Sequence, residues 1–123
     1  MTEDLSAFLN GAWQAADAGG EIIRASWQEP KTVDYKGAID LVTNIDRQCE
    51  GVIVELLSRQ FPEHSILAEE ETQLERGDGS YLWIVDPLDG TTNFAHGYPQ
   101  FCISIALEHN GQIILGLVYD PLR

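Results

Sequence analysis

The sequence predicts an α+β fold, in which helices and a small sheet form a layered sandwich. Three observations support this prediction. Apolar residues recur at helical spacing in two segments of the N-terminal half. Two apolar segments of strand length, 65–68 and 81–85, follow in the middle of the chain. Near the C-terminus, the pair Asn110-Gly111 separates two more apolar segments, which is typical of a β-hairpin.

The first helix is predicted over about residues 4–28. Its apolar stripe consists of Leu5, Phe8, Leu9, Ala12, Trp13, Ala16, Ile23 and Trp27. Gly19 and Gly20 lie on the same stripe, and in a helix interior each glycine costs about 1 kcal/mol relative to alanine. We therefore expect another element to approach the helix closely at these glycines. Pro30 ends the helix.

A second helix is predicted to begin near Thr43, after a short strand at 32–35 and a loop at 36–40. Thr43 and Asp46 have the spacing of a capping box, in which side chains bind the free N–H groups of a helix start. The apolar face of this helix consists of Ile45, Cys49, Val52, Ile53, Leu56 and Leu57. Phe61-Pro62 ends it.

The strands follow the second helix. Residues 65–68 form a short buried strand that leads directly into Glu69. The nearly continuous apolar run 81–85 is typical of a strand covered on both faces, and it ends at Asp86, where Pro87 forces a turn. Segments 101–107 and 113–119 form the hairpin. No covering helix follows it, so we expect a sheet that is cut partway.

Composition limits the classes of function. The chain has 123 residues, enough for one domain, with 44% hydrophobic residues and a formal net charge of −13. Its seven basic residues are scattered, which argues against binding to nucleic acid or to a membrane surface. No membrane-spanning segment or basic leader is present, so we expect a cytoplasmic protein. Cys49 and Cys102 are expected to be reduced and buried.

Some other residues are expected to have structural roles only. His64 and His109 adjoin turns and are predicted to lie in exposed loops, and neither they nor His96 are assigned a catalytic role. The three tryptophans are predicted to anchor the core; they are Trp13, Trp27 and Trp83.

The segment 83–94, with the sequence WIVDPLDGTTNF, carries the clearest chemical signal. The strand ends at Asp86, and Asp89 follows three residues later after a turn. Two carboxylates can therefore face one hard cation such as Mg²⁺. Gly90 and Thr91 then offer small residues and backbone N–H groups for a phosphate. An ordinary turn is the alternative for the five central residues. A calcium loop of the EF-hand type is excluded because the required oxygen ligands are missing.

All twelve residues match the metal-binding signature of the inositol monophosphatase family, which this sequence resembles. Residues 40–46, DLVTNID, look like the family's D-L-V-T-x-x-D segment. Residues 67–70 are similar to its Glu-Glu segment, with Ala68 where the family usually has glycine. The resemblance implies a sandwich of the sugar-phosphatase type, of which residues 1–123 would be the N-terminal, metal-binding portion. The W-D-x-A-A-G-like segment of the family's second half is absent from this sequence.

The resemblance also implies metal ligands. Glu69 would ligate the first Mg²⁺ and help to hold a further, weaker one. Asp86 would bridge two metals, and the backbone carbonyl of Leu88 would complete the first site. Asp89 would ligate the second metal. A complete site would contain two or three Mg²⁺ ions.

Catalytic and substrate-binding roles follow from the same resemblance. Asp46 and Thr91 would orient and deprotonate the attacking water, and Glu69 would serve catalysis through its metal. Asp89, Gly90 and Thr91 would bind the substrate, the last two through N–H groups that bind its phosphate. Each role has an alternative: Asp46 could cap its helix, and Glu69 could belong to a solvated acidic run. Lys36, which matches a lysine of some relatives, is by default a surface lysine.

The function implied is Mg²⁺-dependent hydrolysis of a small phosphorylated polyol, in first place inositol monophosphate. The full enzyme would be a lithium-sensitive homodimer. One alternative is a non-catalytic fragment or interaction module that keeps the metal ligands. Another is a phosphatase of the same superfamily that acts on a different sugar phosphate or on a nucleotide phosphate. Residues 1–123 by themselves are expected to be inactive and to expose an open apolar edge and face.

Overall fold

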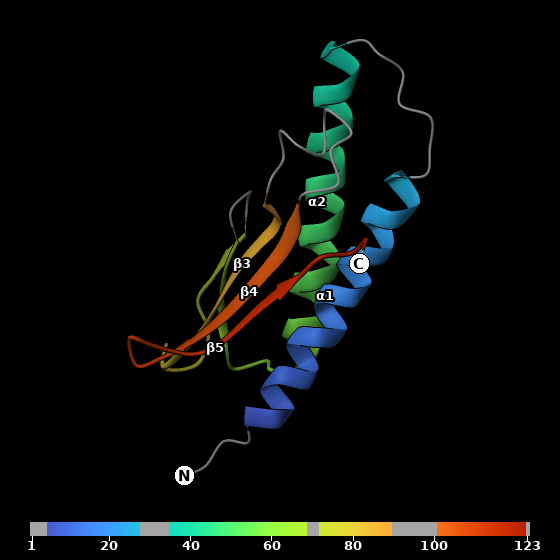
Figure 1. Ribbon diagram of the computed structural model, residues 1–123. Coiled ribbons are helices and arrows are strands. Elements are labelled where there is room, and N and C mark those ends of the chain that lie inside the picture. Colours follow the sequence, from blue (N-terminus) through green and yellow to red (C-terminus); the bar gives the residue numbers. More distant parts are fainter. Residues whose placement is uncertain (1–4, 28–34, 69–71, 90–100, 123) are drawn as a thin grey trace.

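The computed structural model describes residues 5–27, 35–68, 72–89 and 101–122, with the backbone alone for residues 35–43 and 89. The elements in chain order are α1 (Leu5–Trp27), α2 (Tyr35–Gln60), β1 (Ser65–Ala68), β2 (Gln73–Leu74), β3 (Tyr81–Asp89), β4 (Cys102–His109) and β5 (Gln112–Tyr119). The strands form one sheet in the order β2-β1-β3-β4-β5 (Figure 1). β1 runs parallel to β3, and the other neighbours are antiparallel. The predicted α+β fold class is confirmed.

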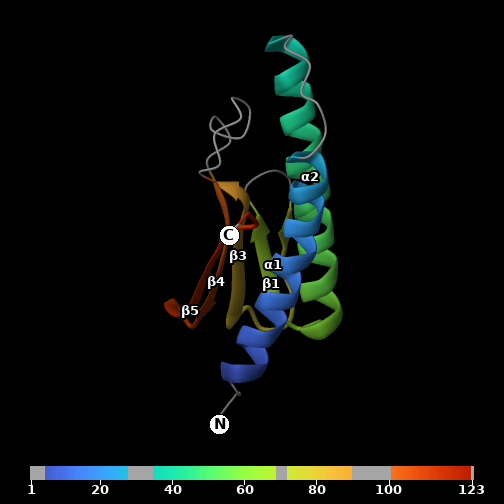
Figure 2. The same ribbon diagram turned by 45° about the vertical axis from the view of Figure 1, so that its right-hand side comes forward.

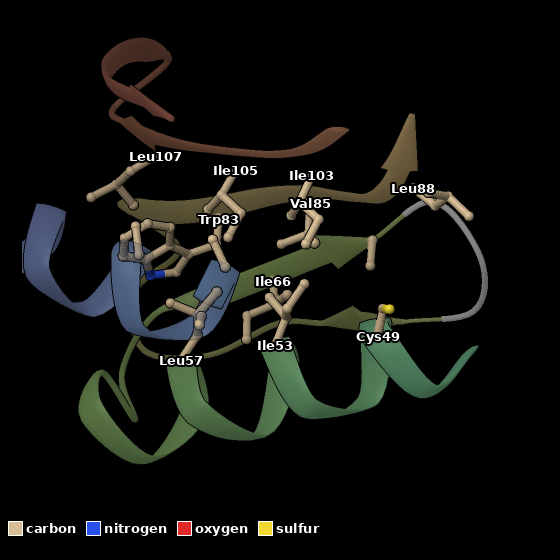
Figure 3. Close-up of a cluster of buried hydrophobic side chains, with 14 of the residues drawn as sticks. Cys49, Ile53, Leu57, Ile66, Trp83, Val85, Leu88, Ile103, Ile105 and Leu107 are labelled. Carbon is tan, nitrogen blue, oxygen red and sulfur yellow. The ribbon is translucent and has the colours of Figure 1, made fainter. Parts of the chain in front are cut away.

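Both helices lie side by side on one face of the sheet (Figures 1 and 2). Buried residues alternate along β4, so that Ile103, Ile105 and Leu107 face the helices. Ile53 and Leu57 of α2 meet them in the core (Figure 3). In a strand every second side chain points to the same face, and in a helix the apolar side chains form one stripe. These two patterns allow the sheet and the helices to share one apolar core.

The predicted close approach at the glycines of α1 is confirmed. α1 is continuous through Gly19 and Gly20. A Cβ atom at Gly19 would lie 3.1 Å from Cδ1 of Ile53 and 3.2 Å from Cδ1 of Ile103. A Cβ atom at Gly20 would meet the ring of Tyr119 at 2.6 Å. A side chain at either position would have to displace side chains of α2 or the sheet, so the two glycines allow this close packing.

The predicted start of the second helix was wrong. α2 begins at Tyr35, so residue 35 is not in a strand, residues 36–40 are helical, and the rest of the predicted strand lies outside the described residues. The helical spacing of Ala38, Val42 and Ile45 extends the apolar stripe backward and favours the longer helix. Thr43 is thus inside the helix, where N–H groups already bind carbonyls one turn earlier, and the predicted capping box does not form.

The predicted turn at Pro87 was also wrong, because β3 continues to Asp89. Asp86 pairs with Ser104 and Asp89 pairs with Cys102, with a register irregularity between the two pairs. Two residues of β3 there oppose one residue of β4, as in a β-bulge. Proline has no N–H group for the ladder and is tolerated at bulges, so the strand bends at Pro87 and continues.

The hairpin prediction is confirmed. Asn110 and Gly111 have φ angles of 51° and 84°, as a type I′ turn requires. The expectation that the strand at 81–85 is covered on both faces is not met: Trp83 and Val85 are buried, but Leu82 and Ile84 are only half-buried. No described helix lies on their face of the sheet (Figure 2).

Four predictions for single side chains need correction. His109 does not lie in an exposed loop: it is the last residue of β4, is half-buried and stacks on the ring of Tyr81. His64 is buried, not exposed, because it stacks between Phe61 and Tyr81 and accepts a hydrogen bond from Nε1 of Trp83 at 3.0 Å. Trp13 is 47% exposed, and its ring makes an edge contact with the ring of Tyr119 in β5. Cys102 is half-buried, whereas Cys49 is buried as expected; both are free thiols. Trp83 anchors the core as predicted.

Within the described ranges, neither helix is long and apolar enough to cross a membrane.

Candidate metal and phosphate site

The parallel pairing of β1 and β3 brings two of the predicted motifs to one edge of the sheet. Ala68, the last residue of β1, pairs with Val85 of β3. Glu69 follows Ala68 in the sequence, and Asp86 follows Val85. The carboxyl ends of parallel neighbours lie at the same edge of a sheet, which is where α/β proteins commonly bind ligands.

Asp86 lies at this edge, on the face of the sheet away from the helices. It lines a hollow of about 360 Å³ together with residues of β1, β3 and β4; the others are Leu67, Ala68, Ile84, Val85, Ser104 and Ala106. Oδ1 of Asp86 accepts a hydrogen bond from the N–H group of Leu88 at 3.3 Å. This bond spans the bulge at Pro87, so the bulge orients the Asp86 carboxylate.

Asp46 approaches the same end of the core from α2. It is only 6% exposed, and it lies one turn before Cys49. Burial raises the pKa of the Cys49 thiol to about 12, and the negative charge of Asp46 contributes to the increase. Figure 3 shows Cys49 at the same end of the core as Leu88. Because Asp46 is inside the helix, the capping alternative for this residue no longer holds.

Glu50 is a further residue of this region, and sequence reasoning missed it. It lies one turn after Asp46 on α2 and is 4% exposed. Its Oε2 atom accepts hydrogen bonds from the backbone N–H group of Thr72 at 3.0 Å and from Oγ1 of Thr72 at 2.7 Å. The spacing of four residues from Asp46 was the only signal for it in the sequence, since residues i and i+4 share a helix face.

The structure describes some of the predicted site residues fully, others by their backbone alone, and others not at all. Asp46, Asp86 and Leu88 are described: Asp46 and Leu88 are buried, and Asp86 lines the hollow on the open face of the sheet. Asp89 is described by its backbone, at the end of β3. The predictions for Glu69, Gly90 and Thr91 fall outside the described residues, and Lys36 is described only as part of α2.

The donor chemistry fits a hard cation. Carboxylate and carbonyl oxygens are the ligands that Mg²⁺ prefers, and Asp86, Asp89 and the Leu88 carbonyl group are supplied by the end of one strand. Among the residues whose side chains are described, no three His, Cys, Asp or Glu side chains are grouped closely enough to hold a metal. Glu69 and the side chain of Asp89 are not among them, so the described residues form only part of the predicted ligand set.

Several known proteins are similar in sequence to this chain. The chain is 46% identical over 121 residues to an inositol-1-monophosphatase of Synechocystis, covering 98% of this chain and 42% of that protein. It is 41% identical over 117 residues to the Nus factor SuhB of Escherichia coli K12, covering 94% of this chain and 44% of SuhB.

A solved structure, the extragenic suppressor protein suhB of Bartonella henselae, superposes with a TM-score of 0.83 at 39% identity. That match covers 94% of this chain and 44% of the other. The chain thus spans less than half the length of the relatives it matches. The family model described as "Inositol monophosphatase family" matches residues 4–123. The chain therefore belongs to the inositol monophosphatase family.

Proposed function

We propose that this chain supplies the metal-binding part of a Mg²⁺-dependent phosphomonoesterase that acts on a small phosphorylated polyol, in first place inositol monophosphate. The observation that carries the proposal is the parallel register of Ala68 with Val85. This register supports a common edge for the chain segments that contain Glu69 and Asp86. The polyol substrate and the dimeric state of a complete enzyme are proposed from the family.

Four residues are proposed as metal ligands: Glu69, Asp86, Leu88 through its carbonyl group, and Asp89. When bound, Mg²⁺ would lower the pKa of a water molecule and offset the negative charge of the phosphate. The charge matters because a chain with a net charge of −13 would otherwise repel an anionic substrate. Li⁺ is proposed to inhibit by competing at this site.

The remaining roles belong to residues around the ligands. Asp46 is proposed to accept a proton from the attacking water, with Thr91 orienting that water. Burial supports this role for Asp46, since buried carboxylates are rare in proteins and are found disproportionately at functional sites. The N–H groups of Gly90 and Thr91 are proposed to bind the phosphate oxygens.

The test uses a chimera in which this chain is joined to the portion of the Synechocystis relative that it does not match. We expect the chimera to release phosphate from inositol monophosphate only when Mg²⁺ is present. Asp86→Asn should abolish the release, because it would remove the charge of a proposed metal ligand. Asp120→Asn, which makes the same change in the C-terminal turn, should not. Full activity in excess chelator would contradict the proposal.

A non-catalytic role is the second candidate, and one observation favours it. A relative that is 41% identical to this chain carries the name Nus factor. The residues 1–123 alone are then proposed to bind metal without turnover. An inactive chimera whose metal affinity still depends on Asp86 would support this candidate over the enzyme.

A further inference from the structure

His64 is a buried titratable residue that the proposed function does not use. It lies in the turn between α2 and β1 and is 8% exposed. Its hydrogen-bond partner Trp83 lies near the start of β3, whereas Leu88 lies near the end of that strand. Figure 3 shows the two residues at opposite ends of the core. A role of His64 is therefore independent of the proposed metal site.

A hydrogen bond joins the ring of His64 to β3. Nε1 of Trp83 donates to Nδ1 of His64 at 3.0 Å. An indole N–H group can only donate, so Nδ1 accepts and carries no proton. In a neutral ring the proton is then on Nε2, and any further proton must bind at Nδ1. Protonation of the ring therefore removes the acceptor of the completely buried Trp83.

Other rings hold His64 in this position. The ring of Phe61 stacks on it at a centroid distance of 5.0 Å, and the ring of Tyr81 stacks on it at 4.4 Å. Phe8 of α1 contacts it edge-on, at 5.5 Å. His64 thus connects α1, the turn between α2 and β1, and β3 at this end of the fold.

The described titratable groups on the neighbouring segments are either exposed or without negative charge near neutral pH. They are Arg59 at the end of α2, Glu63 in the turn, Asp78 in the turn before β3, Tyr81 in β3 and His109 in β4. Solvent screens the exposed carboxylates, so they compensate little for a positive charge on the buried ring. Protonation of His64 in the folded chain is therefore costly.

We propose that the hydrogen bond between His64 and Trp83 is a pH-sensitive link in the fold. At neutral pH the uncharged ring accepts the N–H group of Trp83 and stabilises this end of the core. Below about pH 6.5, the ordinary pKa of histidine, the unfolded chain takes up a proton at His64, and the folded chain can do so only by breaking the link. The stabilisation is therefore present above about pH 6.5 and decreases as the pH falls below this value.

The experiment measures the equilibrium constant of unfolding of the 123-residue chain in urea, at pH 7 and at pH 5. If the folded ring stays uncharged, proton uptake by the unfolded chain raises this constant by about 25-fold between the two pH values. His64→Phe retains a ring in the stack but cannot titrate. We expect its change between pH 7 and pH 5 to be smaller than that of the wild-type chain by about this factor. Equal changes in both chains would overturn the inference.

His109→Phe is the matched control, because His109 belongs to the same stack of rings. It stacks on Tyr81 at 4.0 Å, but its Nδ1 atom lies 3.2 Å from the carbonyl oxygen of Ser80. A proton on this nitrogen strengthens the contact, so protonation of His109 breaks no link. This variant should retain the pH dependence of the wild-type chain within about two-fold. A loss as large as that in His64→Phe would assign the effect to the stack as a whole and contradict the link.

Nitrogen NMR spectra of the wild-type chain decide the question if His64→Phe fails to fold. Nδ1 of His64 should have the chemical shift of an unprotonated nitrogen at pH 7 and keep it in the folded chain as the pH is lowered. Titration of this nitrogen near pH 6.5 in the folded chain would show that the link does not resist acid, and the inference would be wrong. These readouts require no bound metal, so the proposed function is tested separately.

Discussion

The two faces of the sheet differ in what covers them and in which residues they present. On the face toward α1 and α2, Trp83, Ile103 and Ile105 are completely buried. On the other face, Ile113 and Val118 are 59% and 71% exposed. The hollow that Asp86 lines is on this second face. The comparison indicates that the helix-covered face supplies most of the stability of the fold, while the open face presents Asp86 and exposed apolar side chains.

The largest expected effect is a loss of stability. It is measured by replacing an isoleucine with alanine once on the covered face and once on the open face. Ile105→Ala removes a side chain from the core, and we expect a loss of about 2–5 kcal/mol in the free energy of unfolding. Ile113→Ala makes the same change on the open face and should cost no more than about 0.5 kcal/mol. Urea denaturation of both variants measures the difference. Equal losses would mean that the open face is covered in solution.

The next effect separates chemistry from stability at Asp46. In the chimera, Asp46→Asn should lower the turnover number by about 100-fold or more if Asp46 accepts a proton. The matched control is Glu55→Gln, an amide substitution on the exposed side of α2, which should leave turnover unchanged. Turnover numbers and thermal midpoints are measured on the same preparations. A loss of stability without a loss of rate would leave Asp46 only a structural role.

A smaller effect concerns the exposed apolar side chains of the open face. We expect the 123-residue chain to self-associate through this face, and more strongly at high salt, because salt screens repulsion between chains of charge −13. The double variant Ile113→Glu, Val118→Glu should shift the chain toward monomer in sedimentation velocity. Leu9→Glu, on the exposed side of α1, should not. A monomeric wild-type chain at all salt concentrations would refute the expectation.

The smallest effect is a loss of stability in alkali, caused by Cys49 at the inner end of the covered face. Burial raises the pKa of its thiol from 9.0 to about 12. The unfolded chain therefore releases this proton first, so the stabilisation is complete below pH 9 and is lost as the pH rises from about 9 to 12. Between pH 9 and pH 10 the loss should be about 1 kcal/mol. Cys49→Ala should remove this part of the pH dependence in urea denaturation.

Elements that depend on local chemistry were predicted from the sequence. Asn110-Gly111 specifies its hairpin because both residues readily adopt positive φ angles. The turn therefore does not depend on contacts with other parts of the chain. The stripe of α1 predicted that helix to within one residue at each end. Even the close approach at Gly19 could be predicted, since a glycine on an apolar stripe is otherwise unfavourable.

Other features depended on partners that are distant in the sequence. Pro87 favours a turn by itself, but pairing with β4 keeps β3 extended through a bulge. His64 is buried because Phe8, Phe61 and Tyr81 surround its ring, and these come from three separate segments. Trp13 remains half exposed although its ring contacts Tyr119 of β5, so the position of the sheet determines how much of this side chain is covered.

For the site, the sequence alone determined which residues have the right chemistry, because a motif fixes residue types and their spacing. It predicted Asp46 and Asp86 in this way. Only the tertiary structure decided that the ends of β1 and β3 share an edge, that Asp46 is buried inside a helix, and that Glu50 binds Thr72. These are contacts between segments whose relative position depends on packing of the whole core, and no local pattern of residues encodes them.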